Sequence, residues 1–501
     1  MMSEPKRLHP IMILLTIIKS IKDVIVPIAI YFFIFFFKDP SDNVWIRWSP
    51  YFFITLLLLS IFVSSFIKWI RYTYRLEDNE LRIEHGLFVK KKRYIPFERI
   101  QSLDFSETIL HRPLGLVKVT VETAAGSADE AEADMTAIKK DEATTIRKMI
   151  AEAKSTGKLP GENEDTSGEE TEEKGLVLYK ITRKQLLFFA STSGRAGVII
   201  AAVAAFAGQF ADVIPFDEVF NEMTDIIKTG FLLIIVLILA VLFIVWILSV
   251  VWAYLKYNDF TLRLVDDELV ITRGLLEKRT TTIPVRRIQA LKISESIFRQ
   301  PFGYASVSVE YAGGSILDEN KTDGVLIPIV KKREIPRLLQ KGLPEYIFEE
   351  QYHSAPKRAQ RRYFFIKSVV MTLVTIGLSI WLWPYGLLAI LLIGLMWGWG
   401  VLQYRSAAWK VTGRQLILRY RDIQQHTVYL QKNRIQSLDY SVNWFQKRAH
   451  LATIGTFVMS RGGGVAVVKH LEAEDAQEIY KWYLPNTSPK QDDVKSQNLE
   501  S

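Results

Sequence analysis

The sequence predicts an α+β membrane protein in which one unit is used three times: a pair of membrane helices followed by a small β-rich domain. Two observations predict this architecture. Hydrophobic residues make up 49% of the 501 residues, and they gather in blocks of about 17–25 residues, the length that crosses a bilayer. In addition, the motif Arg-Ile-Gln-Ser-Leu-Asp at residues 99–104 returns, with small changes, at residues 287–292 and 434–439.

Further residues recur at fixed distances from each copy of the motif, which indicates an internal repeat of one domain. In the first two copies a Gly-Leu pair, an Ile-Pro pair and a Pro-x-Gly triplet stand at matching offsets: Gly86-Leu87 and Gly274-Leu275, Ile95-Pro96 and Ile283-Pro284, Pro113 to Gly115 and Pro301 to Gly303. The third copy has Arg421-Asp422, Leu430-Gln431 and His450 at these places. If the last glycine serves a positive φ, His450 is expected to require a different turn.

Apolar blocks predict six spans in three pairs. They cover residues 24–37, 51–70, 196–214, 230–254, 363–383 and, after a turn at 384–386, residues up to about 402. Residues 11–37 leave two alternatives open, one long helix with its charges near the cytoplasmic interface or, slightly favoured, an interfacial helix leading into a short span. Residues 1–10 lack a small-residue cleavage site, so the first helices are expected to act as uncleaved targeting signals.

Each soluble copy shows short alternating apolar runs with turn residues between them, and then a stretch with helical spacing. The strand pattern is clearest at residues 116–123, and the closing helices are expected at 139–153, 332–339 and 472–483. Residues 154–175 form an acidic linker that cannot bury enough apolar surface to fold alone and is expected to be disordered. The predicted segments are a first helix pair at 1–71, a domain at 72–153, the linker, a helix pair at 176–256, a domain at 257–343, a helix pair at 344–403, a domain at 404–484 and a flexible tail at 485–501.

An even number of crossings before each domain places all three domains on one side of the membrane. Lys and Arg gather at the domain ends of the spans, whereas residues 212–228, between the third and fourth spans, are acidic. The excess of positive charge on cytoplasmic segments predicts that the domains and both termini are cytoplasmic. The net charge of +9 suits a protein that faces an anionic leaflet.

The motif residues together with Arg112-Pro113-Leu114-Gly115-Leu116 resemble the bacterial pleckstrin-homology (PH) domain family. The three copies on helix pairs are similar to the YdbT-type membrane proteins of Gram-positive bacteria. The resemblance implies, for each domain, a PH-like antiparallel β-sandwich or partly open barrel with a C-terminal helix. It also implies a multi-pass protein of the bacterial plasma membrane, no catalytic residues, and a link to the cell envelope.

Several chemistries are not expected from the residues. The absence of cysteine excludes disulfides, thiol nucleophiles and cysteine metal sites. The seven histidines show no metal-ligand spacing, so neither a metal nor a cofactor is predicted. Basic residues follow the membrane boundary and do not concentrate on one domain, so nucleic acid is not expected as a partner.

Two candidate binding surfaces remain. Lys90, Lys91, Lys92 and Arg93 lie between two predicted strands, where they could contact anionic lipid headgroups or form a solvated basic turn. The repeated motif could present a common surface: Arg99, Gln101, Arg287, Gln289, Arg434 and Gln436. The plainer interpretation is that Ile100, Leu103 and their counterparts repeat because they pack in the core.

The sequence therefore favours a non-enzymatic membrane protein whose cytoplasmic domains are binding or assembly modules for proteins or membrane lipids. The family resemblance implies a setting in envelope maintenance or resistance to membrane-active antimicrobials. Expected partners are the anionic leaflet, further copies of the chain, or a smaller membrane protein with one PH-like domain. The alternative is a transporter or lipid-handling protein regulated by its domains, although the spans carry few polar groups away from their ends.

Overall fold

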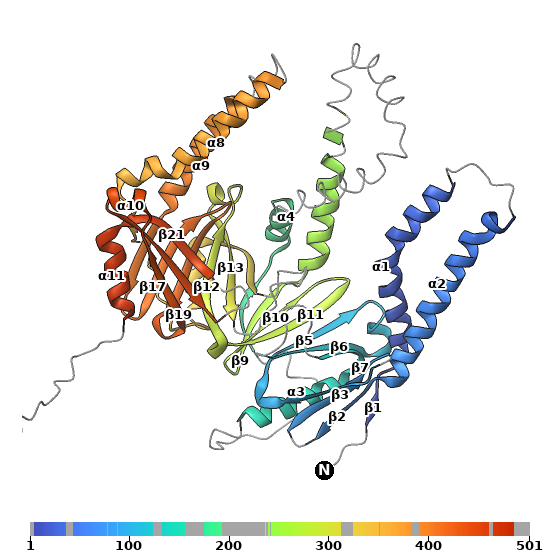
Figure 1. Cartoon of the computed structure of the whole chain (residues 1–501). Coiled ribbons are helices and arrows are strands. Elements are labelled where there is room, and N and C mark those ends of the chain that lie inside the picture. Colours follow the sequence, from blue (N-terminus) through green and yellow to red (C-terminus); the bar gives the residue numbers. More distant parts are fainter. Residues whose placement is uncertain are drawn as a thin grey trace, which may run out of the picture. The chain divides into compact units, whose positions relative to one another are not determined.

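A computed structural model (Figure 1) describes residues 5–36, 44–77, 79–87, 89–123, 133–155, 175–192, 236, 239–240, 242–311, 324–349, 351–381, 390–459 and 464–484. The chain divides into two compact units, Met1–Arg286 and Arg287–Ser501. The boundary does not follow the repeat. It falls inside the second copy, at the start of the repeated motif.

Long apolar helices rise from both units. The first unit contains α1 (Ile11–Phe36) and α2 (Val44–Arg71), and the second contains α8 (Gln360–Trp381) and α9 (Ile390–Ser406). Among the described residues, Tyr51–Arg71 and Lys357–Ile380 have the length and mean hydropathy of membrane spans, and Leu242–Tyr257 is a shorter apolar helix. The predicted span at 196–214, the acidic loop, the linker at 156–174 and the tail lie outside the described residues, so the count of six spans stays a prediction.

The N-terminal segment is one continuous helix, α1, with Pro27 inside it. Residues 11–23 therefore do not form a separate interfacial helix. The chain at the start of α1 packs on the first domain, because Leu8 and Met12 are buried in its core. The Trp69 indole N–H, near the end of α2, donates to the Leu8 carbonyl oxygen over 2.9 Å. Hence α1 and α2 are both anchored on the domain that follows them.

The first domain has the expected strands-then-helix order. The strands β1 (Lys6–Arg7), β2 (Thr73–Glu77), β3 (Glu80–His85) and β4 (Lys91–Pro96) form one antiparallel sheet in that order. Three further antiparallel strands follow, namely β5 (Ile100–Thr108), β6 (Leu116–Thr123) and β7 (Ala133–Lys139), and α3 (Lys140–Ser155) closes the domain. Alternation along β6 buries Val117, Val119 and Val121 against residues of α3, as a half-buried strand requires.

Both seven-stranded sheets cross the repeat boundary. In the first unit the order is β7-β6-β5-β11-β10-β9-β8, where β8 (Leu176–Lys180), β9 (Thr261–Val265), β10 (Glu268–Arg273) and β11 (Glu277–Pro284) start the second copy. In the second unit the order is β14-β13-β12-β18-β17-β16-β15. Its strands are β12 (Ile288–Glu295), β13 (Tyr304–Tyr311), β14 (Val325–Lys331), β15 (His353–Ser354), β16 (Ala408–Thr412), β17 (Gln415–Arg421) and β18 (Gln425–Gln431).

The second unit ends with a three-stranded sheet, β19 (Ile435–Ser441), β20 (Leu451–Val458) and β21 (Gly464–Glu472), closed by α11 (Ala473–Tyr483). The closing helix of the second copy is short, with α7 (Ile335–Leu339) after a 3₁₀ turn. The domains are therefore antiparallel sheets with C-terminal helices, as the sequence predicts.

His450 does not use a different turn, so that expectation is wrong. Its φ is +52°, and the φ angles of Gly115 and Gly303 at the matching positions are +61° and +68°. A Cβ built on either glycine meets nothing within 4 Å. Because the space is open, a side chain there costs only the backbone strain of the left-handed region, and the same turn survives in the third copy.

Candidate membrane-facing surface

The tips of three equivalent β-hairpins are bonded to the ends of membrane helices. In the first copy Arg71 Nη1, at the end of α2, donates to the Leu87 carbonyl oxygen over 2.7 Å. In the second, the Leu275 N–H donates to the Leu255 carbonyl oxygen over 2.9 Å. In the third, Gln403 Nε2 on α9 donates to the Arg421 carbonyl oxygen over 3.0 Å. Each tip is therefore held where an apolar helix meets its domain.

The recurrent Gly-Leu pair has a physical reason at these tips. Gly86 and Gly274 have φ angles of +138° and +103°. A Cβ on Gly86 would lie 1.9 Å from the Val89 carbonyl oxygen, and one on Gly274 would lie 2.1 Å from that of Glu277. Only glycine fits so close an approach with this backbone.

Large apolar side chains at the hairpin tips are exposed to solvent. They are Val89, Leu275, Leu276 and Ile423. A second set lies in the loop after each motif strand, again at matching repeat positions: Ile109 and Leu110, Ile297 and Phe298, Trp444 and Phe445. Phe298 and Phe445 are 71% and 64% exposed, which a soluble surface would not favour for aromatic rings.

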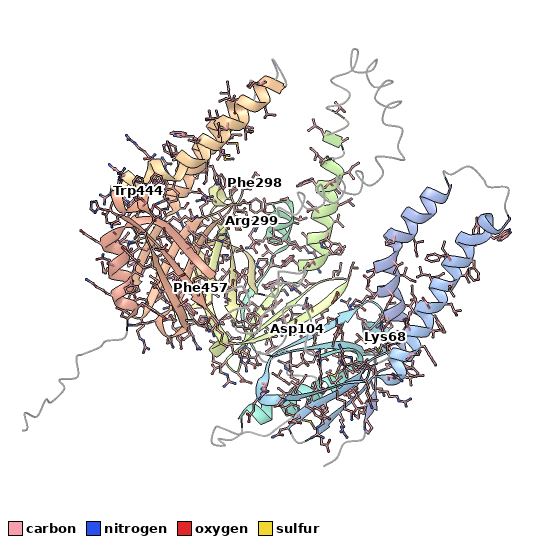
Figure 2. All side chains as sticks on the ribbon, in the orientation of Figure 1. Lys68, Asp104, Phe298, Arg299, Trp444 and Phe457 are labelled. Atoms are coloured by element: carbon pink, nitrogen blue, oxygen red, sulfur yellow. The ribbon has the colours of Figure 1, made fainter. Side chains whose placement is uncertain are left out.

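The two sets are brought together by the strand pairing between copies. In the first unit Arg112 Nη2 donates to the Leu275 carbonyl oxygen over 2.8 Å, which joins the loop after β5 to the β10–β11 tip. In the second unit Arg421 Nη2 donates to Gln300 Oε1 over 2.6 Å, which joins the β17–β18 hairpin to the loop after β12. Figure 2 shows Phe298 and Trp444 at the end of the second unit from which α8 and α9 rise. We call these two sets of apolar residues the membrane-facing loops.

Cationic groups accompany the membrane-facing loops. The guanidinium of Arg448 lies 4.0 Å from the centre of the Trp444 ring, and α8 is preceded by Lys357 and Arg358. Arg358 Nε donates to the Ala449 carbonyl oxygen over 2.9 Å, so this charge is also fixed beside the loop after β19. Aromatic rings with adjacent cations are typical of protein surfaces at headgroup depth.

The predicted lysine cluster lies at one tip and continues along β4. Lys90 and Lys92 both form ion pairs with Glu84 on β3, the second at 3.4 Å. Hydrogen bonding from Lys90, with a smaller contribution from Lys92, holds the pKa of Glu84 below its usual value. Lys91 is exposed, and Arg93 is half-buried on the same strand. The structure therefore combines these residues with Val89 at the tip of the first hairpin.

The polar residues of the motif are not buried alike in the three copies. The apolar positions of the motif, Ile100, Ile288 and Ile435 with Leu103, Leu291 and Leu438, are buried in all three copies. The polar positions differ between copies: Arg99 is exposed and Arg287 and Arg434 are half-buried, whereas Gln289 is buried and Gln436 is exposed. The Gln101 side chain lies outside the described part. Gln289 Nε2 donates to the Arg287 carbonyl oxygen over 3.0 Å, a local bond beside an irregularity of the ladder.

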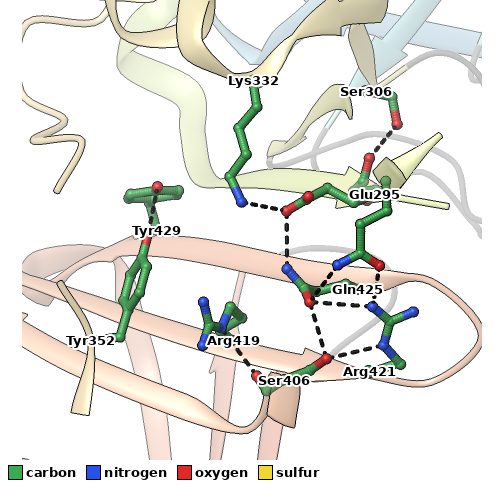
Figure 3. A network of polar contacts seen from close by, with 11 residues as sticks. Glu295, Ser306, Lys332, Tyr352, Ser406, Arg419, Arg421, Gln425 and Tyr429 are labelled. Carbon is green, nitrogen blue, oxygen red and sulfur yellow. Dashed lines mark hydrogen bonds and ion pairs between the residues drawn. The ribbon is translucent and has the colours of Figure 1, made fainter. Parts of the chain in front are cut away.

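Sequence reasoning missed the junctions between copies. A mostly buried network crosses the β12–β18 junction (Figure 3): Gln425 Nε2 and Lys332 Nζ donate to Glu295 Oε1 over 3.0 and 2.7 Å. The Ser406 hydroxyl, at the last residue of α9, donates to Gln425 Oε1 over 3.0 Å. Strand periodicity could not find these contacts, because it does not say which edge pairs with which.

Comparison with known proteins shows the family to which the chain belongs. The family described as "Bacterial PH domain" matches residues 15–154, 202–343 and 364–487. The chain belongs to this family, and it is a transmembrane protein with repeated bacterial PH-like domains.

One relative is similar to the chain over nearly the whole length of both proteins. The chain is 38% identical to the "UPF0699 transmembrane protein YdbT" of Bacillus subtilis (strain 168) over 499 residues, covering 96% of this chain and 99% of the relative. The similarity therefore includes the helices as well as the domains.

Proposed function

We propose that this protein is a non-enzymatic platform of the bacterial plasma membrane, whose cytoplasmic PH-like domains lie on the inner leaflet and serve as binding and assembly modules. One observation carries the proposal: three equivalent hairpin tips are bonded to helix ends and hold exposed apolar side chains beside them. The helices thereby fix the depth of the membrane-facing loops.

The energetics favour contact with lipid. Moving a large apolar side chain fully out of water contributes about 1.5–3 kcal/mol. Because the helices already confine the domains to the surface, little additional freedom is lost when the loops enter the headgroup region. The lysines next to Val89 add attraction for anionic lipids, at about 1 kcal/mol each near the surface.

Spin labels of the full-length protein in nanodiscs test this orientation. The chain has no cysteine, so Phe298→Cys, Ile423→Cys and Phe445→Cys each introduce one labelling site, and Glu478→Cys on α11 is the matched exposed control. We expect lipid-soluble oxygen to relax the three loop labels and a water-soluble nickel complex to relax the control. Equal accessibility of all four labels to the nickel complex would contradict the proposal.

We further propose that the biological setting is envelope maintenance or resistance to membrane-active antimicrobials, as the family resemblance suggests. A deletion strain is expected to grow less well with a cationic membrane-active peptide. The wild-type gene should restore growth, whereas a gene with serine at Phe298, Trp444 and Phe445 should not. Unchanged sensitivity of the deletion strain would remove this setting and leave the membrane orientation to the label experiment.

A further inference from the structure

Two strand edges of the tandem are left over by the pairing between copies. The motif strands β5 and β12 each pair with the last hairpin strand of the next copy, β11 and β18 respectively. Among the described strands, the corresponding edges of β4 and β19 have no such ladder, because β4 is the end of its sheet beside β3 and β19 is the end beside β20. The tandem therefore begins with one half of a junction and ends with the other half.

The two internal junctions have the same register. Leu103 lies opposite Thr282 in the first junction, and Leu291 lies opposite Tyr429 in the second. These pairs occupy equivalent positions of the repeat, since residue 282 corresponds to 429 and residue 103 to 291. The same frame assigns Leu438 to Tyr94 and Ser441 to Lys91 as the opposed positions of a third junction.

Side chains at the unpaired edges of β4 and β19 are more exposed than their equivalents inside the internal junctions. Thr282 and Tyr429 are 6% and 4% exposed inside their junctions, whereas Tyr94 at the equivalent position is 53% exposed. On the motif strands, Ser106 and Ser294 are buried, and Ser441 is exposed. The edges of β4 and β19 therefore expose side chains at positions that are buried in the internal junctions.

Charge makes the two edges complementary. Asp439 on β19 stands where β5 carries Asp104, and Lys91 on β4 stands where β11 carries Arg279. In the existing junction Arg279 Nη2 lies 2.8 Å from Asp104 Oδ2. Edge lysines ordinarily discourage strand addition, so β4 favours a partner strand that offers a carboxylate at this position.

We propose that β19 of one chain pairs antiparallel with β4 of a second copy of the same chain, in the register that the internal junctions share. The contact is head-to-tail, so each added copy leaves one β4 edge and one β19 edge open, and the assembly is a ring or an open row in the membrane plane. A second copy is the occupant that the observations favour, because this chain itself carries both complementary edges. This contact uses strand edges and not the membrane-facing loops, so it is independent of the proposed membrane orientation.

Disulfide trapping between full-length chains tests the contact. Opposed residues of antiparallel strands have Cα atoms about 4.5–5.5 Å apart, within the range of a disulfide. Lys91→Cys and Ser441→Cys chains with different tags are co-expressed and oxidised in membranes. We expect a mixed dimer only when both variants are present, and none when Glu478→Cys replaces Ser441→Cys. The absence of the mixed dimer would overturn the proposal, as would cross-linking of Ser441→Cys to a different protein in its place.

A chain that carries both Lys91→Cys and Ser441→Cys distinguishes pairing between copies from pairing within one chain. Head-to-tail pairing gives a ladder of covalent multimers, whereas a disulfide within one chain without multimers would overturn the second copy as occupant.

A charge exchange provides a readout without cysteine. Asp439→Lys and Lys91→Glu chains should each associate less than wild type by mass photometry in nanodiscs. Mixing the two variants should restore dimers, because the substituted β19 edge of one chain then carries the cation and the substituted β4 edge of the other carries the carboxylate. Failure of the mixture to associate when wild type does would also overturn the register.

Discussion

Asp104 and Arg279 are 175 residues apart in the chain and form an ion pair across two copies of the repeat, with 2.8 Å between Oδ2 and Nη2. Asp104 belongs to the motif strand β5 and Arg279 to the hairpin strand β11 of the next copy. Asp104 is buried, and Arg279 is mostly covered. This pair shows that the motif is not only core, because Asp104 also takes part in the junction between the first and second copies.

Removing the cation from this junction is expected to weaken it. Arg279→Met leaves the buried carboxylate of Asp104 without its ion partner, which should lower the free energy of opening of β5 and β11 by about 2–3 kcal/mol. Hydrogen exchange of their backbone amides measures the effect. The exposed pair Lys6–Glu142 is the control, since Lys6→Met should cost less than about 1 kcal/mol. Equal protection of β5 and β11 in wild type and Arg279→Met would contradict the role of the pair.

Two glycines of the second copy should respond differently to substitution. Gly274→Ala places a Cβ 2.1 Å from a backbone oxygen, so it should distort the hairpin tip and cost about 3 kcal/mol or more. Gly303→His has open space and copies the residue of the third copy, so its cost should stay near about 1–2 kcal/mol. Apparent melting temperatures of the full-length protein in detergent compare the two. A larger loss for Gly303→His would show that the close approach is not what selects glycine.

Acid is expected to destabilise the second unit through His426. Its Nδ1 lies 2.8 Å from the Ser294 hydroxyl and its Nε2 lies 3.0 Å from Asp422 Oδ1. Burial lowers the pKa of His426 to about 4, helped by Lys292 and partly opposed by Asp422. Because the unfolded chain binds this proton at higher pH than the folded chain, stability is lost as pH falls from about 6.5 to about 4, by on the order of 3 kcal/mol.

Denaturant titrations between about pH 7.5 and 4 check the size and sign of this loss. His426→Gln keeps hydrogen-bonding capacity and removes the proton uptake, so its stability should vary less over this range than that of the wild type. A variant with the same acid dependence as wild type would assign the loss to other groups.

Anionic lipid should affect the first hairpin tip more than the third. A spin label at Val89→Cys, next to Lys90 and Lys92, is expected to enter anionic nanodiscs more deeply than zwitterionic ones because the lysines attract the leaflet. Replacing both lysines by glutamine should abolish this difference. The matched control is Ile423→Cys, whose tip has Asp422 and no lysine. Equal dependence on lipid charge at both labels would contradict lipid contact by the lysines.

The repeat, the succession of short strands in each copy and the closing helices could be predicted from the amino-acid sequence, because apolar periodicity and turn residues act locally. The sequence also marked Gly86 and Gly274, whose recurrence reflects a backbone that only glycine adopts. It misjudged His450, because no local pattern shows that the space around a turn is open. It could not find the Asp104–Arg279 pair, the Glu295–Gln425 network or the exposed loop residues as a set.

How the copies join depends on tertiary packing. A strand pattern shows which face of a strand is apolar, but both edges of every strand carry the same backbone donors and acceptors, so the partner of each edge is left open by the sequence. Folding resolves this choice by packing whole sheets, which places residues 175 positions apart in contact. The boundary between the two compact units consequently lies inside a copy of the repeat, whereas the individual strands and helices recur with the repeat.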